Sequence, residues 1–323
     1  MTDPTSLRPR RPLVTLVAAA ALALAPAAPA LAQTDSAASS AVTAAQSKHQ
    51  PALRVGGDVT TSRSYTLQEL RELSTVTAKV PVGRHGERTA TGASLFALVS
   101  AAAPKLPDVK NAILQPVVTV YGDRHDAVSF ALGELNPSFG NRDALLVTAW
   151  NGRAVEKTAA LAVPGDRGTA RSISRVSRVQ VSVPVLKAVP PAQAGSVTIS
   201  NGGRTSTLSA AKLAKLRTTT RTVTFLSGSG QQTRVETGPL LADVLRVAGI
   251  RASANTWVSA VGSDGVAATV TLGESSSAGS TQLLSLVEDG AKLTQPRLVP
   301  DGDVRGGRYI SDVVTIVVGN ICR

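Results

Sequence analysis

Two Gly-rich phrases in this chain carry side chains that could bind an anion. The first reads PGDRGTARSISRV at residues 164–176, and the second reads DGDVRGGRYISDV at residues 301–313. At a shift of 137 positions, Arg308 falls on Arg171. Backbone N–H groups of such a turn and a guanidinium can together hold a phosphate or a sulfonate. The candidate ligand residues are Asp166, Arg171, Ser172, Ser174, Asp303, Arg308 and Ser311.

The same phrases also allow a purely structural interpretation. Asp166 stands five residues before Arg171, and Asp303 stands five residues before Arg308. An ion pair inside each phrase would fix the turn without binding any ligand. The sequence leaves both interpretations open.

The first phrase carries three further basic residues, Arg167, Arg175 and Arg178. Together with Arg171 they follow steps of four, four and three residues, which would align them on one helix face. The second phrase has other residues at these places, namely Val304, Asp312 and Thr315. A feature found in one phrase is not needed for the fold, so it indicates either an anion site in the first copy or a solvated basic face.

Histidine and cysteine offer little for metal binding or catalysis. Outside the N-terminal region the histidines are His85, within GRHGER, and His125. Cys322 is the one cysteine and stands next to the last residue, so an intrachain disulfide or a zinc cluster is excluded. We therefore predict no metal ligand set and assign no catalytic residue.

Length and composition limit the classes of protein to consider. The chain has 323 residues, 43% of them hydrophobic, which is enough for about two domains with cores of their own. Its net charge of +12 suits an anionic partner. Nucleic acid is not expected, because the basic residues are scattered and only 3% of the residues are aromatic.

The N-terminus reads as a secretory signal peptide over residues 1–32. A basic start and an apolar run from Leu13 to Ala25 precede Ala30-Leu31-Ala32, a small-residue cleavage site. The run is too short for an ordinary membrane span, so we predict an exported protein without a transmembrane segment after cleavage. Ordinary secretion is expected, and the partial motif at Arg10-Arg11 leaves twin-arginine export as the alternative.

The rest of the chain uses one order of elements twice. Residues 33–51 are small, polar and aperiodic, which predicts a disordered linker. We assign residues 52–185 to a first copy, 186–194 to a Pro-rich linker and 195–320 to a second copy.

Each copy is expected to combine short strands with two short helices, which predicts an α+β fold. The helices are predicted at 66–73 and 91–102 in the first copy, with Thr66 and Glu69 forming a capping box. In the second copy they are predicted at 207–216 and 237–249, with Pro239 at the start of the latter and Gly249 as its stop. Hairpin turns are predicted at Asn151-Gly152, Asp264-Gly265, Asp289-Gly290 and in SGSGQQ at 227–232.

The repeated motifs of the chain resemble the molybdopterin-binding domain of the sulfite oxidase family. The resemblance lies in Thr-Gly-x-x-Leu at 91–95 and 237–241, in Ser263-Asp264-Gly265 before a strand that ends in Leu272-Gly273-Glu274, and in the closing phrases. It implies two tandem mixed α/β domains of that type, each built around a pterin cofactor whose phosphate and pterin are held by the closing phrase.

The resemblance also implies a molybdenum-ligating cysteine, which this chain does not have. The corresponding stretches, 79–88 and 224–234, contain no cysteine. The cofactor therefore stays unassigned, with molybdopterin as the candidate that the resemblance names.

Three functions follow from these observations. The first is a non-catalytic module that binds an anionic small molecule or an envelope protein. The second is a molybdopterin-dependent oxidoreductase whose metal is held by oxo groups, water or His85. The third is a purely structural pairing of the two copies. Motifs of serine hydrolases, zinc proteases, phosphate loops and dinucleotide-binding folds are absent from the sequence.

Overall fold

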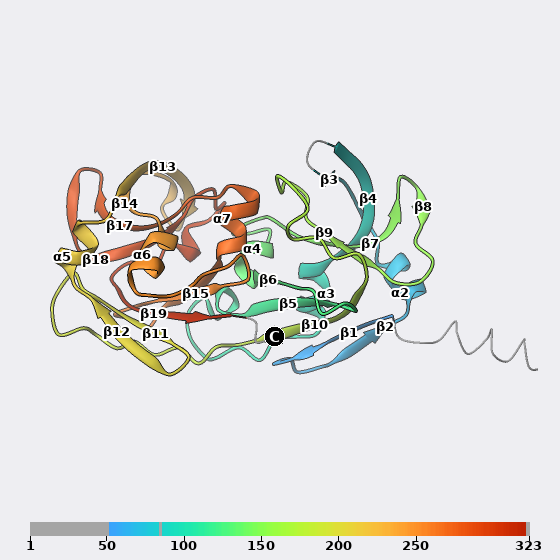
Figure 1. The fold of residues 1–323 in the computed structure, drawn as a ribbon, viewed down its shortest axis with the longest axis horizontal. Coiled ribbons are helices and arrows are strands. Elements are labelled where there is room, and N and C mark those ends of the chain that lie inside the picture. The colour runs from blue at the N-terminus through green and yellow to red at the C-terminus, as the bar shows by residue number, and fades with distance from the viewer. Residues whose placement is uncertain (1–51, 84–85, 321–323) are drawn as a thin grey trace, which may run out of the picture. The chain divides into compact units, whose positions relative to one another are not determined.

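The computed structural model describes residues 52–83 and 86–320. The predicted signal peptide and linker, together with His85 and Cys322, lie outside the described residues. We call residues 52–185 the N-terminal half and residues 195–320 the C-terminal half. The fold is a strand-rich mixture of helices and strands, compatible with the predicted α+β class (Figure 1).

The first sheet of the N-terminal half has the strand order β2-β1-β10-β5-β6. Its strands are β1 (Leu53–Gly57), β2 (Arg63–Tyr65), β5 (Val117–Gly122), β6 (Ala127–Ala131) and β10 (Val176–Ser182). The last strand, β10, returns to pair in parallel with β1, whereas its other neighbour β5 is antiparallel. Because β10 directly follows the Gly-rich phrase, this return places the phrase at the end of the sheet.

The first sheet of the C-terminal half has the corresponding order, β12-β11-β19-β15-β16. Its strands are β11 (Val197–Asn201), β12 (Arg204–Leu208), β15 (Trp257–Gly262), β16 (Ala267–Thr271) and β19 (Val313–Gly319). Here β19 follows the second phrase and pairs in parallel with β11. The strands of the two halves therefore match in order and in direction.

Each half has a second, antiparallel sheet. In the N-terminal half it contains β3 (Val76–Val82), β4 (Gly86–Ser94), β7 (Leu145–Trp150), β8 (Arg153–Ala154) and β9 (Ala160–Ala162). In the C-terminal half it contains β13 (Thr218–Ser227), β14 (Gly230–Pro239), β17 (Gln282–Glu288) and β18 (Ala291–Pro300). The hairpin turns predicted at Asn151-Gly152, Asp289-Gly290 and within SGSGQQ lie between paired strands of these sheets.

The helices are short. The N-terminal half has α2 (Leu67–Glu72), α3 (Leu95–Ala101), α4 (Leu132–Leu135) and the 3-10 turn η1 (Ala112–Leu114). The C-terminal half has α5 (Ala210–Ala214), α6 (Leu241–Val247), α7 (Leu272–Ala278) and the 3-10 turn η2 (Gly306–Arg308). The capping box at α2 is confirmed, because the Thr66 side chain accepts from the Glu69 N–H and the Glu69 carboxylate accepts from the Thr66 N–H.

Three details of the predicted elements are wrong. Residues 207–208 continue strand β12, and α5 begins only after its cap Ser209. Pro239 ends strand β14 opposite Thr218 instead of starting a helix, and a proline is tolerated at a strand end. The four arginines from Arg167 to Arg178 do not share a helix, because residues 164–175 form turns and Arg178 lies on β10.

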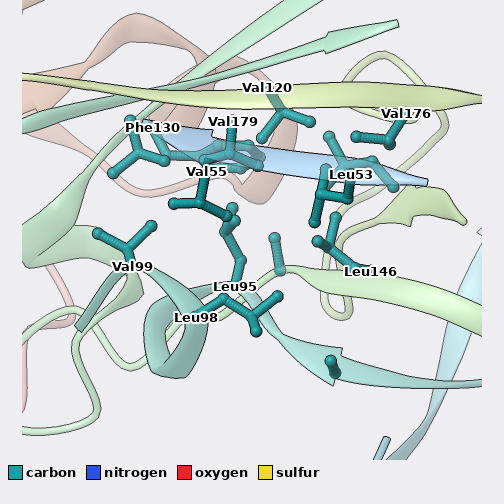
Figure 2. Close-up of a cluster of buried hydrophobic side chains, with 14 of the residues drawn as sticks. Leu53, Val55, Leu95, Leu98, Val99, Val120, Phe130, Leu146, Val176 and Val179 are labelled. Carbon is teal, nitrogen blue, oxygen red and sulfur yellow. The ribbon is translucent and has the colours of Figure 1, made fainter. Parts of the chain in front are cut away.

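Each half has a core of aliphatic side chains. Figure 2 shows part of the N-terminal core, where Leu53 and Val55 of β1 and Val179 of β10 face Leu95 and Leu98 of α3. The C-terminal core forms in the same way between its first sheet and α6, and it also contains Leu114 of the N-terminal half. Among the described residues, no helix has the length and apolar character needed to cross a membrane.

The two halves contact each other along β6 and β16, the outer strands of their first sheets. The Asn255 side chain donates to the Ala127 carbonyl (2.8 Å) and accepts from the Ser129 N–H (3.0 Å), so it satisfies two backbone groups of β6. The Thr269 hydroxyl donates to the Gln115 carbonyl across the same contact (2.7 Å). The closing phrases lie at one end of this contact.

Candidate functional site

Arg171 of the first phrase lies in the interior, with 1% of its surface exposed. Its Nε donates to Asp166 Oδ2 (2.9 Å) and its Nη2 to Asp166 Oδ1 (2.6 Å). Its Nη1 donates to the carboxylate of Glu134, the one acidic residue of α4. A planar guanidinium suits such two-pronged pairing, so all three of its nitrogens are used inside the protein.

Arg308 of the second phrase has the same surroundings and is fully buried. Its Nε donates to Asp303 Oδ2 (2.7 Å), and its Nη2 also donates to the Asp303 carboxylate. Its Nη1 and Nη2 donate to the two oxygens of Glu274 on α7, at 2.9 and 2.7 Å. The ion pair that the sequence offered as a structural alternative is therefore present in both phrases, and each gains a second carboxylate.

Each arginine also reaches across to the other half. A Cβ added at Gly273 of the C-terminal half would lie 3.1 Å from Arg171 Cδ. A Cβ added at Gly133 of the N-terminal half would lie 2.8 Å from Arg308 Cδ. Real Cβ contacts are rarely this close, so glycine at these two positions lets each stem lie against the opposite half.

These residues form one group, which we call the buried charge cluster. Its members are Glu134, Arg142, Asp166, Arg171, Glu274, Asp303 and Arg308. Arg142 of the N-terminal half donates to Glu274 of the C-terminal half (3.0 Å), and Thr271 Oγ1 donates to Glu134 Oε2 (3.3 Å). The cluster thus joins the halves by charge-assisted hydrogen bonds in both directions.

The two glutamates of the cluster differ in acidity. Burial raises the pKa of Glu134 to about 7, with the charge of Glu274 adding to the rise and that of Arg171 opposing it. Burial would also raise the pKa of Glu274, but the charges of Arg308 and Arg142 outweigh it, so that pKa lies below its ordinary value. Glu134 is therefore the member that can take up a proton near neutral pH.

The serines of the phrases are not part of the cluster. Ser172, Ser174 and Ser311 are exposed, and the Ser311 hydroxyl accepts from Arg297 Nε (3.2 Å). The structure thus brings together four of the seven predicted ligand residues and leaves the three serines at the surface.

Sequence reasoning missed Glu134 and Glu274. Both belong to a Leu-Gly-Glu triplet that occurs once in each half, at 132–134 and at 272–274. This triplet recurs in both halves, as the Asp and Arg of the Gly-rich phrases do. That shared recurrence was the signal that could have found the two glutamates, since a buried arginine needs carboxylate partners.

The other charged and metal-binding candidates are dispersed. Arg175 pairs at the surface with Asp123 (2.6 Å), and the guanidinium of Arg178 lies over the Tyr121 ring, 4.0 Å from its centre. His125 is at a positive φ of 64° in the β5–β6 turn, where the C-terminal half has Gly265. Across residues 52–83 and 86–320, no group of three or more His, Cys, Asp or Glu side chains is arranged to hold a metal ion.

Comparison with known proteins gives a limited result. No protein-family model and no curated protein matches the sequence. Among solved structures, the chain is similar to the sulfane dehydrogenase SoxCD from Paracoccus pantotrophus, with 15% identity over 83% of this chain and 78% of that chain. The TM-score of this match is 0.34. A likeness at this level defines neither a family nor an activity for this chain.

The predicted cofactor residues can be tested against a pterin phosphate by their chemistry. An anion at Arg171 or Arg308 would have to displace Asp166 or Asp303 and leave that carboxylate buried without a partner. Leaving one partner of a buried pair uncompensated costs about 3–5 kcal/mol. The four buried residues as arranged therefore do not fit a pterin phosphate, and the cofactor stays unassigned.

Proposed function

We propose that this chain is an exported, non-catalytic binding module. It consists of two degenerate copies of a molybdopterin-binding-type domain and takes an anionic small molecule or an envelope protein as its partner. The matching strand order of the two halves supports the origin by duplication. The basic, apolar and small-residue order of the N-terminus supports export.

One observation carries the proposal. Arg171 and Arg308, which the resemblance assigns to the cofactor, donate to carboxylates of the chain itself. Their role in this protein is to fix the phrases and to join the halves. When these arginines are paired with carboxylates of the chain, they stabilise the fold but leave no unpaired guanidinium for a cofactor.

The charge that remains available is at the surface. Residues 1–32 carry three Arg and one Asp, so about +10 of the net charge of +12 remains after the proposed cleavage, and the cluster adds no positive charge because its four carboxylates exceed its three arginines. An exported protein with such a surface attracts anionic partners over distances of about one Debye length.

The experiment is the molybdenum and pterin content of the mature protein, purified from its own envelope without chelators. Folded protein that contains neither would support the proposal. Pterin without metal would support a binding module and would identify the phosphate-bearing pterin as its anionic ligand. Near-stoichiometric molybdenum with pterin would overturn the proposal in favour of an oxidoreductase without a cysteine ligand.

A further inference from the structure

A cavity of about 380 Å³ lies against the C-terminal half and receives a side chain of the N-terminal half. Its lining residues are Arg167, Thr219, Arg221, Leu240, Ala242, Ser275, Ser276, Gly279, Ser280, Thr281 and Gln282. Two guanidinium groups and five hydroxyl groups thus line one hollow, and three of the hydroxyls, those of Ser275, Ser276 and Ser280, donate to backbone carbonyls. Its volume falls in the range of small-molecule sites.

Arg167 is exposed and its backbone is held by the C-terminal half, while its charge is not paired among the described residues. Its backbone N–H donates to the Ser277 carbonyl of the C-terminal half (2.9 Å). A Cβ added at Gly279 would lie 2.3 Å from Arg167 Nη2, so the guanidinium lies directly on the backbone there. Within the described part of the chain, the guanidinium of Arg167 makes no hydrogen bond or ion pair.

Arg221, on strand β13, lines the same cavity and is only partly engaged. Its Nε donates to the Thr281 hydroxyl (3.1 Å) and its Nη1 to the Thr220 carbonyl (3.1 Å). The nearest carboxylate is Asp301, whose Oδ2 lies 3.9 Å from Nε with both side chains partly exposed. Such an exposed pair is weak, so Arg221 retains positive charge for a ligand.

Gln282 lines the cavity, but its side-chain amide is directed into the protein. Gln282 is 3% exposed, and its Nε2 donates to the Thr271 carbonyl (2.9 Å). Its Oε1 has no hydrogen-bond partner among the described residues. Because Oε1 is itself shielded from solvent, a ligand in the cavity does not reach it, and Gln282 forms part of the wall without binding the ligand.

The matching cavity on the opposite side lacks this chemistry. Val304 corresponds to Arg167 at the shift of 137 positions. Ala78, whose strand β3 pairs with β4 as β13 pairs with β14, stands where the C-terminal half has Arg221. The opposite cavity, of about 350 Å³, is lined by Val76, Ala78 and Asp143 and by one arginine, Arg142, whose guanidinium is paired with Glu274. The two arginines are thus dispensable for the fold itself.

We propose that the cavity between Arg167 and Arg221 binds a small ligand through an oxyanion group, such as a phosphate, sulfate or sulfonate. This assignment rests on the proposed function, since it names the site and ligand class of the anionic partner. Two guanidiniums supply charge-assisted donors, and the Thr219 and Thr281 hydroxyls, which donate to no other group among the described residues, complete the hydrogen bonds.

The test is calorimetric titration of the folded chain with inorganic phosphate, sulfate and glycerol phosphate at constant ionic strength set by NaCl. We expect saturable binding of at least one of the three. Preference for the monoester over inorganic phosphate would identify an organic ligand, and preference for the inorganic ions a free anion.

Each variant replaces an arginine of the cavity by the residue that the other half has at the corresponding position. Arg167→Val and Arg221→Ala should each weaken binding about tenfold or more, and the double variant should abolish it. Arg175→Ala removes the same charge at a distant surface pair and should bind as wild type does. Circular dichroism and the Tm show that each variant is folded.

Two results would overturn the site: no saturable binding of any probe by the folded wild type, or equal affinity in wild type and the double variant. Neither result depends on the metal and pterin content. An oxidoreductase could keep this site, and a module that binds an envelope protein could lack it, so the two proposals fail separately.

Discussion

The stem of Arg308, in the C-terminal half, lies against Gly133 of the N-terminal half, where an added Cβ would be 2.8 Å from Arg308 Cδ. Arg171 and Gly273 form the reciprocal contact at 3.1 Å. The two halves are therefore joined by an exchange in which each arginine pairs with carboxylates of its own half and packs on a glycine of the other.

This exchange predicts that Gly133→Ala destabilises the protein. The Arg308 side chain cannot move away, because Asp303 and Glu274 hold its guanidinium on two sides. Overpacking of a close contact costs about 1–3 kcal/mol. Urea unfolding should report this loss, whereas Gly168→Ala, with open space around its Cβ, should change the free energy of unfolding by less than about 0.5 kcal/mol. Equal stability of the two variants would contradict the contact.

Removing an arginine of the cluster should cost more than removing a surface arginine. Arg308→Met removes the positive charge that pairs with both Asp303 and Glu274. Breaking a buried pair in this way costs about 3–5 kcal/mol. Arg175→Ala breaks a pair that is 45% and 38% exposed and should cost less than about 1 kcal/mol. Comparable losses in urea unfolding would show that the cluster does not stabilise the fold.

The same experiment extends to Arg308→Lys. An ammonium cannot reach two carboxylates with the geometry of the guanidinium fork, so the lysine variant should recover only part of the stability that Arg308→Met loses. Full recovery would mean that charge alone, without the paired hydrogen bonds, accounts for the effect.

Local features of the fold could be predicted from the sequence because they depend on neighbours in the chain. The capping box of Thr66 and Glu69 and the helix stop at Gly249, whose φ is +78°, involve residues within one turn of each other. The α+β class followed from the same local patterns. Pro239 was misassigned because strand pairing, which involves the distant Thr218, decided its conformation.

The site could be predicted only in part because its partners are distant in the sequence. The Asp166–Arg171 pair spans five residues and was foreseen as an alternative, but Glu134 is 37 residues from Arg171. The helix expected for Arg167 to Arg178 does not form, because turns begin at Gly165 (φ +82°) and strand β10 takes over at Val176. The role of Arg167 depends on Ser277, which belongs to the other half.

Glu134 should make stability depend on pH. Its pKa is about 7 in the folded protein and near the ordinary 4.5 when unfolded, so the folded state binds the proton more tightly. Stability from this group is complete below pH 4.5 and is lost as the pH rises towards 7, by about 3 kcal/mol in total. Asp303, whose pKa burial also raises, acts in the same direction.

The Glu134→Gln variant isolates this contribution. A glutamine oxygen can still accept from Arg171 but carries no charge to desolvate. The free energy of unfolding of wild type relative to the variant should therefore fall between pH 5 and pH 8. A difference that is constant across this range would show that Glu134 does not change its protonation there.

Asn255 offers a test of the contact between the outer strands. Its side chain is the partner of the Ala127 carbonyl and the Ser129 N–H, and Ser129 is fully buried. Asn255→Ala leaves both backbone groups without these bonds, at a cost of about 1–3 kcal/mol for each group that water does not reach. Asn255→Asp keeps the acceptor for Ser129 but replaces the donor to Ala127 by a charged oxygen, so it should not restore stability. Hydrogen exchange at the Ser129 amide should speed up in Asn255→Ala more than at Val118 in the interior of the same sheet, and unchanged exchange at Ser129 would mean that Asn255 does not protect this strand.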